Sequence, residues 1–289
     1  MATSLSDVNH IILVLSGKGG VGKSTVACQL ALALANVHGK KVGLLDVDIC
    51  GPSVPTICGV TGKDVYRGDA GWEPVSLFHE QHEADTAASA TGNVKIMSIA
   101  FLLPSENDAV VWRGPKKDAM IRQFVTDVHW GALDYLIIDT PPGTSDEHLT
   151  LCEVLKPFNT AGAVIVTTPQ DVATDDVKKE LSLCHKLELR CLGVVENMSG
   201  FVCPHCAHCT DIFSKGGGKK LAEMYEVEFL GAIPIDPTLS LAEDKGQCFV
   251  TTATDANSPT VRKTVAAVTG VIDAILKQVE KSAQLQQRH

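Results

Sequence analysis

The sequence predicts an α/β fold with a mostly parallel, doubly wound sheet, and three observations lead to this prediction. Continuous apolar runs of strand length recur along the 289 residues, which is typical of strands covered on both faces. Helix-like segments alternate with these runs, and this order implies right-handed crossovers between parallel strands. A glycine-rich loop follows the first run, and such sheets bind ligands beyond the carboxyl ends of their strands.

The expected strands and helices alternate along the chain. Apolar runs predict strands at 11–15, 42–45, 94–99, 135–138, 163–167, 193–196 and 229–232. Helical patterns lie at 26–37, 117–125, 147–155, 172–187 and 218–225. From Val261 to Val279, apolar residues spaced by three and four form the stripe of an amphipathic helix that we expect to pack on the sheet. We expect one domain over 1–289, with flexible ends at 1–9 and 282–289 and an exposed loop at 79–93.

Composition and charge exclude several classes of function. The chain is 45% apolar and 20% charged, which is typical of a globular protein with an ample core. A net charge of -9 argues against a broad nucleic-acid surface, which needs a dense positive stripe. No apolar stretch approaches the roughly 20 residues of a membrane span. The N-terminal residues resemble neither a secretory nor a mitochondrial signal, so we expect a cytoplasmic protein with no membrane or nucleic-acid partner.

The glycine-rich loop has the spacing of a phosphate-binding P-loop. It follows the first predicted strand and precedes a helix, and it comprises Gly17, Lys18, Gly19, Gly20, Val21, Gly22, Lys23, Ser24 and Thr25. Glycines let backbone N–H groups surround phosphate oxygens, and the helix N-terminus adds its dipole. Lys23 is expected to bind the phosphates and the Ser24 hydroxyl to coordinate Mg2+.

Acidic residues close two further predicted strands on the same side of the sheet. Asp139 follows an apolar strand, the usual position of a carboxylate that holds Mg2+ directly or through water. Asp48 is placed to orient or deprotonate the attacking water, and Asp46 to support Lys23 or the metal shell. The Pro-Pro-Gly turn after Asp139 makes a second candidate switch loop, in which the Gly143 N–H could sense the γ-phosphate.

Ten cysteines divide into scattered ones and a cluster. We expect Cys28, Cys58, Cys152, Cys184, Cys191 and Cys248 to pack as small hydrophobes, whereas Cys50 lies in a candidate switch loop. Cys203 and Cys206 have the C-x2-C spacing that lets two thiolates reach one metal or cluster, with Cys209 nearby. A single chain is short of a fourth cysteine for a ferredoxin-type site. Two chains could supply four thiolates; a zinc site using His205 or His208, or a surface pair without function, are the alternatives.

Lys18, an additional lysine inside the phosphate loop, is the signature residue of the deviant Walker A, or MinD-like, ATPases. Together with the segments 46–53, 112–116, 134–148 and 197–200, the chain resembles the Mrp/ApbC branch of that class over roughly residues 10–250. The resemblance implies a P-loop ATPase in which Lys18 reaches the nucleotide of a partner chain. It also implies that Asn197 contacts the adenine and that Pro234 lies near the base.

Members of this branch are scaffold or carrier ATPases for iron-sulfur cluster assembly. The resemblance therefore implies ATP, Mg2+ and a labile 4Fe-4S cluster that Cys203 and Cys206 bridge between two protomers for transfer to apo iron-sulfur proteins. The first cysteine is Cys28, so the chain is most similar to the shorter cytosolic type, which lacks an N-terminal cluster site. Its partner would be the longer cytosolic paralogue, in a heterotetramer, or a second copy in a homodimer.

Two other functions are compatible with the residues alone. A MinD- or ParA-like positioning ATPase would act on membrane or DNA, but it predicts a basic tail or face, and the final helix mixes Lys277 with Asp273 and Glu280. A zinc-stabilised P-loop regulator would use the cysteine cluster for structure only.

Overall fold

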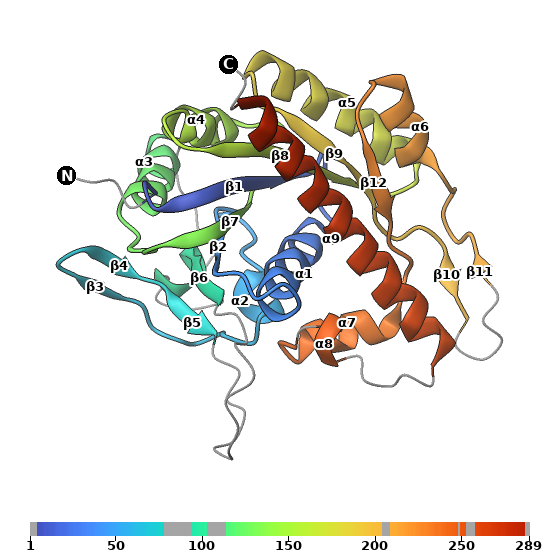
Figure 1. Ribbon diagram of the computed structural model, residues 1–289, viewed down its shortest axis with the longest axis horizontal. Coiled ribbons are helices and arrows are strands. Elements are labelled where there is room, and N and C mark those ends of the chain that lie inside the picture. The colour runs from blue at the N-terminus through green and yellow to red at the C-terminus, as the bar shows by residue number, and fades with distance from the viewer. Residues whose placement is uncertain are drawn as a thin grey trace.

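The computed structural model describes residues 5–77, 94–102, 114–203, 209–247, 249–252 and 258–286. Its main feature is an eight-stranded sheet with the order β12-β9-β8-β1-β7-β2-β6-β5 (Figure 1). Every pair in this sheet is parallel except β5 with β6. The strands are β1 (Val8–Leu15), β2 (Val42–Asp46), β5 (Val75–Leu77), β6 (Val94–Ser98), β7 (Leu133–Asp139), β8 (Thr160–Thr167), β9 (Cys191–Glu196) and β12 (Phe229–Ala232). The predicted doubly wound fold is confirmed.

Helices cover both faces of the sheet (Figure 1). One face packs against α1 (Lys23–Asn36) and α9 (Pro259–Gln286), and the other against α3 (Gly114–Thr126), α4 (Asp146–Leu155) and α5 (Asp171–Lys186). The remaining helices are α2 (Val54–Ile57), α6 (Gly217–Met224), α7 (Pro237–Asp244), α8 (Phe249–Thr252) and the 3-10 turn Ile99–Leu102.

The central strand shows why the apolar runs are continuous. In β1, Ile12 and Val14 belong to the core on the α1 side, whereas Ile11, Leu13 and Leu15 belong to the core on the α5 side. Successive side chains of a strand point to opposite faces. Because both faces are buried, every position is apolar, and the strand lacks the alternation of a half-exposed sheet.

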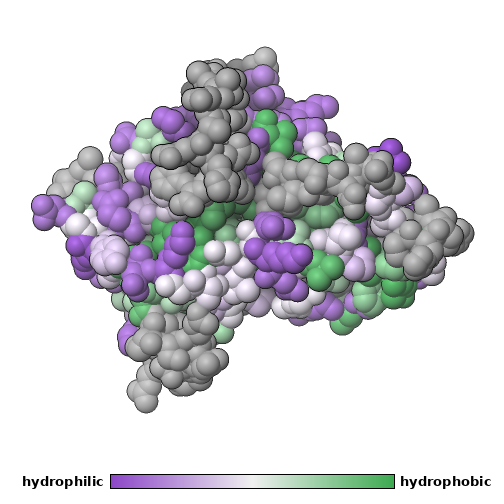
Figure 2. Space-filling model, turned by 90° about the horizontal axis from the view of Figure 1, so that it is seen from below, coloured by the Kyte–Doolittle hydropathy of each residue, from purple (hydrophilic) through white to green (hydrophobic). Residues whose placement is uncertain are grey.

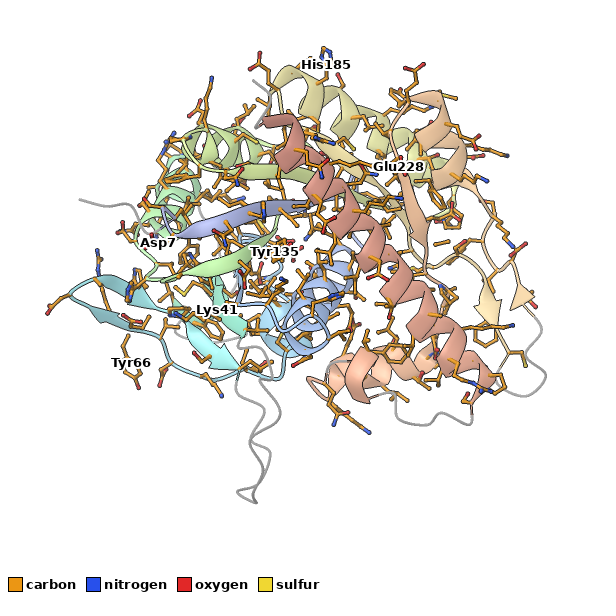
Figure 3. All side chains as sticks on the ribbon, viewed as in Figure 1. Asp7, Lys41, Tyr66, Tyr135, His185 and Glu228 are labelled. Carbon is orange, nitrogen blue, oxygen red and sulfur yellow. The ribbon has the colours of Figure 1, made fainter. Side chains whose placement is uncertain are left out.

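The amino edge of the sheet lies opposite the edge where the glycine-rich loop begins. Asp7, Lys41 and Glu228, labelled in Figure 3, directly precede β1, β2 and β12. Near this edge the ring of Tyr135 on β7 lies beside that of His10 on β1, with 5.4 Å between their centroids. The carboxyl ends of the strands lie at the opposite side, where the glycine-rich loop follows β1.

Several elements have no counterpart among those predicted. They include β5 at the sheet edge, the hairpin of β3 (Tyr66–Gly68) with β4 (Gly71–Glu73), and the pair of β10 (Phe201–Val202) with β11 (Cys209–Thr210). Parts of the ends expected to be flexible belong to regular elements, since residues 8–9 lie in β1 and 282–286 in α9. The predicted loop 79–93 lies outside the described residues.

Seen from below, hydrophobic patches are set among hydrophilic residues (Figure 2). Among the described residues, no helix has the length and apolar character needed to cross a bilayer.

Candidate nucleotide site and cysteine hairpin

The phosphate loop connects the end of β1 to the start of α1. Gly20 and Gly22 have φ angles of 76° and 79°, a left-handed conformation that side chains with a Cβ rarely adopt. Gly22 is the N-cap of α1 and offers no side chain, so the first N–H groups of this helix have no side-chain cap. Such groups, with the positive end of the helix dipole, form an anion-binding site.

A cavity of about 270 Å³ lies over this loop at the carboxyl edge of the sheet. Its lining combines the phosphate loop with the loops after β2 and β7: Ser16, Lys18, Gly19, Gly20, Gly22, Lys23, Ser24, Thr25, Asp48, Gly51, Ser53, Ile57 and Pro142. The structure thus brings Asp48 to the phosphate loop, as the sequence predicts. Gly51 and Ser53 belong to the segment 46–53 named above, whereas Ile57 was not predicted, because it reaches the cavity only through the position of α2.

Asp139 contacts both Lys23 and Ser24 of the phosphate loop. The Lys23 Nζ lies 2.6 Å from Asp139 Oδ1, and the Ser24 hydroxyl donates to Asp139 Oδ2 at 2.6 Å. Lys23 is 6% exposed and Asp139 is fully buried. A hydroxyl and a carboxylate side by side are ligands that a hard cation such as Mg2+ prefers. These two residues fit the predicted Mg2+ site.

Asp46 lies beside Asp139, because β2 and β7 pair with these two residues in register. Its Oδ1 accepts the Asp48 N–H at 3.1 Å, and its Oδ2 accepts the Ser98 hydroxyl at 3.0 Å. Burial raises the pKa of the Asp46 carboxyl well above its ordinary range; the negative charge of Asp139 adds to the effect, and Lys23 opposes it. The Asp46 carboxyl therefore takes up a proton more readily than usual, and a cation bound beside it would compete with that proton.

The loop after β7 is folded back onto the phosphate loop. The Gly143 N–H, predicted as a sensor of the γ-phosphate, donates to the Ser16 carbonyl at 2.7 Å. The Thr140 hydroxyl donates to the Val14 carbonyl at 2.8 Å. Both contacts hold this loop against β1 and the start of the phosphate loop.

Lys18 lines the cavity and is half-buried. Within the described part of the chain its ammonium group makes no hydrogen bond or ion pair, whereas its carbonyl accepts the Ser16 hydroxyl at 3.1 Å. The Lys23 ammonium group is therefore paired within its own chain, whereas the Lys18 ammonium group has no partner among the described residues.

Asn197 reaches the phosphate loop from the end of β9. Its side-chain amide donates to the Val21 carbonyl at 2.9 Å, and the side chain is 5% exposed. The residue does not line the cavity, nor does Pro234, which follows β12. The sequence could not predict the contact with Val21, since it joins residues 176 positions apart.

Two residues of the cysteine cluster, Cys203 and Cys209, lie at the short strands β10 (Phe201–Val202) and β11 (Cys209–Thr210), and we call these two paired strands the cysteine hairpin. Its strands β10 and β11 pair antiparallel, with Val202 opposite Cys209, and Cys203 directly follows β10 and is half-buried. Cys206 lies outside the described residues. Across the portion of the chain that is described, no three His, Cys, Asp or Glu side chains are grouped to hold a metal.

The scattered cysteines behave as predicted where they are described. Cys28, Cys58 and Cys184 are buried, and burial raises the pKa of Cys152 and Cys191 to about 11. A raised pKa keeps a thiol protonated and unreactive. Cys50 is exposed, with the Lys117 Nζ 3.3 Å from its sulfur. Cys248 lies outside the described residues.

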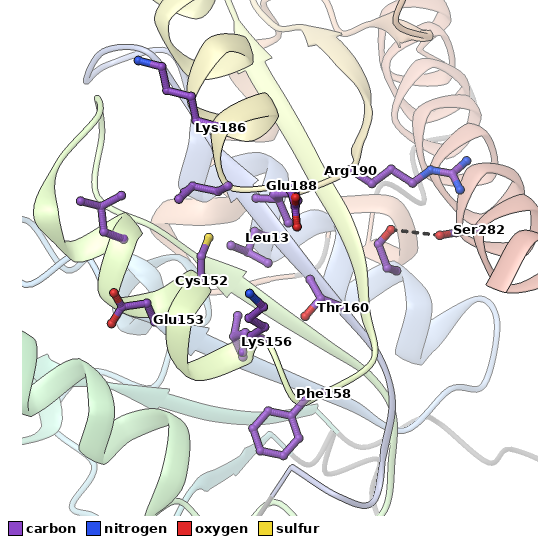
Figure 4. Close-up of a pocket in the computed structure, with 15 residues that line it drawn as sticks. Leu13, Cys152, Glu153, Lys156, Phe158, Thr160, Lys186, Glu188, Arg190 and Ser282 are labelled. Atoms are coloured by element: carbon purple, nitrogen blue, oxygen red, sulfur yellow. Dashed lines mark hydrogen bonds between the residues drawn. The ribbon is translucent and has the colours of Figure 1, made fainter. Parts of the chain in front are cut away.

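A larger cavity, of about 870 Å³, lies at the amino edge of the sheet (Figure 4). It is lined by the ends of α4 and α5, the segment before β9, the start of β8 and Ser282 of α9, with Leu13, Phe158 and Leu189 among its apolar residues. None of the predicted site residues that the structure describes lines it. We assign the nucleotide to the smaller cavity, because phosphate recognition needs the backbone and lysine of the glycine-rich loop.

The parallel sheet, the glycine-rich loop before α1 and the buried carboxylate that pairs with its lysine define a P-loop NTPase. The chain belongs to the family described as NUBPL iron-transfer P-loop NTPase, within the ParA group, which matches residues 7–272.

Relatives with known names and structures agree with this assignment. The chain is 57% identical over 244 residues to the cytosolic Fe-S cluster assembly factor nubp2 of Xenopus laevis, covering 84% of this chain and 86% of that protein. It is 55% identical over 247 residues to the protein of the same name from Homo sapiens, covering 86% and 87%.

Solved structures show the same fold. A nucleotide-binding protein from Archaeoglobus fulgidus in complex with ADP is 40% identical, with a TM-score of 0.71 and coverage of 90% of this chain and 93% of that one. The cell division ATPase MinD of Pyrococcus furiosus is 21% identical, with a TM-score of 0.61 and coverage of 93% and 99%. At that identity the likeness concerns the fold alone.

Proposed function

We propose that the chain is a cytosolic iron-sulfur cluster assembly scaffold, which binds and hydrolyses ATP and carries a labile 4Fe-4S cluster between two protomers. One observation carries the proposal: the cysteine hairpin and the nucleotide cavity both lie at the carboxyl ends of the strands of the sheet. Only residues 197–200 separate the end of β9 from β10, and Asn197 contacts the phosphate loop. The names of the relatives at 55–57% identity support the same function.

The nucleotide chemistry follows from the contacts of the cavity. The Lys23 ammonium group would leave the Asp139 carboxylate and bind phosphate oxygens instead. The Ser24 hydroxyl and the Asp139 carboxylate would then hold Mg2+. Asp48 would orient or deprotonate the attacking water, and Asp46 would support the metal shell. The Mg2+ supplies charge neutralisation at the phosphates. ADP in the Archaeoglobus fulgidus relative supports nucleotide binding at this loop.

Recognition of the base is proposed for Asn197 and the Pro234 turn. The Asn197 Nδ2 is occupied by Val21, and within the described residues its Oδ1 has no hydrogen bond. A free amide oxygen is an acceptor suited to the amino group of adenine. Asn197 can then bind the base without giving up its contact with the phosphate loop.

The cluster is the cargo, and Cys203 with Cys206 would supply two of its four thiolates. The other two would come from a partner chain, either a second copy or the longer cytosolic paralogue in a heterotetramer. Lys18, uncommitted within its own chain, would reach the nucleotide of that partner. The recipients would be apo iron-sulfur proteins.

Anaerobic reconstitution with iron and sulfide, followed by metal analysis, tests the proposal. A brown iron-sulfide chromophore that disappears in Cys203→Ala and Cys206→Ala is the expected result, with Cys191→Ala as the matched control that keeps it. Stoichiometric zinc in place of iron would instead indicate the zinc-stabilised regulator. Transfer to an apo acceptor is expected to depend on ATP and to be slower in Lys23→Ala.

A further inference from the structure

The cysteine hairpin is fastened at both of its ends by one buried carboxylate. Glu196, the last residue of β9, is 1% exposed. Its Oε1 accepts the Ser199 hydroxyl at 2.6 Å and the Gly216 N–H at 3.1 Å, and its Oε2 accepts the Gly218 N–H at 2.7 Å. Ser199 precedes the hairpin and Gly216 follows it, so both chain segments that enter and leave the hairpin meet at this side chain.

Glu196 also caps a helix that has no cap of its own. Gly216 is the N-cap of α6 and has a left-handed φ of 76° with no side chain to bind the first N–H groups. The Glu196 carboxylate takes that role from another element, and a negative charge at a helix N-terminus is stabilising. A Cβ on Gly218 would lie 3.1 Å from the Glu196 Cβ, which shows how closely α6 packs here.

The neighbouring residue connects this clamp to the phosphate loop. The Asn197 side chain donates to the Val21 carbonyl, and its Nδ2 would collide with a Cβ added to Gly22, the N-cap of α1. Met198 then has a φ of 58°, an unfavourable left-handed conformation for a residue with a long side chain. The surrounding contacts must hold it there, and along the chain Asn197 lies directly between Glu196 and this strained residue.

We propose that Glu196 is the positioning residue of the cysteine hairpin, and that nucleotide bound at the phosphate loop orders the hairpin through Asn197 and Glu196. The proposal rests on the proposed function, in which Asn197 binds the base. Nucleotide fixes Asn197 against Val21, the short segment 196–199 loses freedom, and the hydrogen bonds from Ser199, Gly216 and Gly218 to Glu196 open less often. Binding that restricts one site and thereby orders another couples the two without a large change of shape.

Amide hydrogen exchange of the apo protein, with and without Mg-ATP, measures this coupling independently of any cluster. In the wild type we expect nucleotide to slow exchange of the amides at 216–220 by about tenfold, the size of one charge-assisted hydrogen bond. In Glu196→Gln one carboxylate oxygen becomes an N–H2 donor that faces backbone N–H groups. We expect the nucleotide effect to fall below about twofold while the Kd for nucleotide stays within about threefold.

Two further variants make the result specific. Asp134→Asn is the matched control, because Asp134 also accepts a backbone N–H, from Lys41 at 2.8 Å, but at the amino edge of the sheet. It should leave the nucleotide effect unchanged. Ser199→Ala removes one donor and leaves both backbone bonds of Glu196, so an intermediate effect is expected; this variant also serves if Glu196→Gln folds poorly.

The outcomes separate this inference from the proposed function. Unchanged exchange at 216–220 when wild type binds nucleotide would overturn the coupling, and so would a full nucleotide effect in well-folded Glu196→Gln. Either result leaves cluster binding by Cys203 and Cys206 intact. Conversely, a protein that binds no cluster but shows the nucleotide effect, and loses it in Glu196→Gln, would refute the scaffold function and keep the coupling.

Discussion

At the scale of single residues, Lys23 of the nucleotide site forms an ion pair with the Asp139 carboxylate when no phosphate is bound. Lys23 and Asp139 are both buried, and their contact of 2.6 Å compensates each charge in the absence of phosphate. A buried ion pair contributes little net stability when intact, but loss of one partner leaves an uncompensated charge. Lys23 therefore neutralises Asp139 in the free protein, and under the proposed function it would bind phosphate when nucleotide is present.

Lys23→Ala should lower both stability and nucleotide binding. We expect the free energy of unfolding to fall by about 3 kcal/mol, because Asp139 remains buried without its cation. Mg-ATP should no longer raise the Tm of the variant. Urea unfolding and thermal unfolding with and without Mg-ATP measure both effects. Stability equal to wild type would show that Asp139 is neutral in the free protein and needs no cation.

Glu180 of α5 should make stability depend on pH. The side chain is fully buried, and within the described residues neither carboxylate oxygen has a hydrogen bond. Burial, with a smaller contribution from Asp176, raises its pKa to about 7. Between its ordinary value of 4.5 and about 7, the folded protein binds this proton more tightly than the unfolded chain. The free energy of unfolding therefore falls as pH rises through that window and levels off above it.

The variant Glu180→Gln cannot lose the proton, so its unfolding free energy should exceed that of wild type by about 3 kcal/mol at pH 8. The two proteins should converge near pH 5. Urea unfolding at both pH values is the measurement, and Glu223→Gln, at an exposed position of α6, is the control. A difference that is the same at both pH values would mean that Glu180 does not titrate in this range.

At the scale of elements, Gly17 sets the distance between the phosphate loop and α5. A Cβ on Gly17 would lie 2.6 Å from the carbonyl carbon of Asp176 and 2.8 Å from the Val177 nitrogen. These are backbone atoms of a helix, which cannot turn aside as a side chain can. Gly17 therefore lets the phosphate loop pack closely against α5, in addition to its expected role in the phosphate-binding loop.

Gly17→Ala should cost about 2 kcal/mol of stability, because the loop and α5 must move apart. Gly19→Ala is a matched substitution in the same loop: its Cβ would meet only the Pro142 Cγ, at 3.9 Å, so a change under about 0.5 kcal/mol is expected. Chemical denaturation of the two variants decides the matter. Equal stability of both would contradict the packing role of Gly17.

The elements also show what the sequence could and could not predict. Strands buried on both faces, such as β1 and β7, are continuous apolar runs that one local window detects. Strand β5 has three residues and exists through its antiparallel pairing with β6, a distant segment, so no local pattern indicates it. The phosphate loop was predicted from its glycine and lysine spacing together with the apolar strand before it and the helical pattern after it. The link from Glu196 to Gly216 and Gly218 was not, since it depends on the fold bringing α6 to the end of β9.

At the scale of the whole molecule, Lys18 predicts a site shared between two chains. Lys18→Ala should bind ATP with a Kd within about threefold of wild type and lose roughly 100-fold in hydrolysis rate, the usual cost of removing one group that stabilises transition-state charge. Hydrolysis and nucleotide titration of the purified variant test this. A rate equal to wild type would exclude a catalytic role for Lys18.

Mixing two inactive variants distinguishes a lysine acting in its own chain from one acting across a dimer. A Lys23→Ala chain is expected to bind no nucleotide, but its Lys18 can still reach the nucleotide of its partner. A Lys18→Ala chain is expected to bind nucleotide, but it has no Lys18 to supply to its partner. In a symmetric dimer, random mixing makes about half of the dimers mixed, each with one complete site. Hydrolysis should therefore recover to at most about a quarter of the wild-type rate. If Lys18 acted within its own chain, no mixture would exceed the sum of its two parts, and the predicted homodimeric site would be refuted.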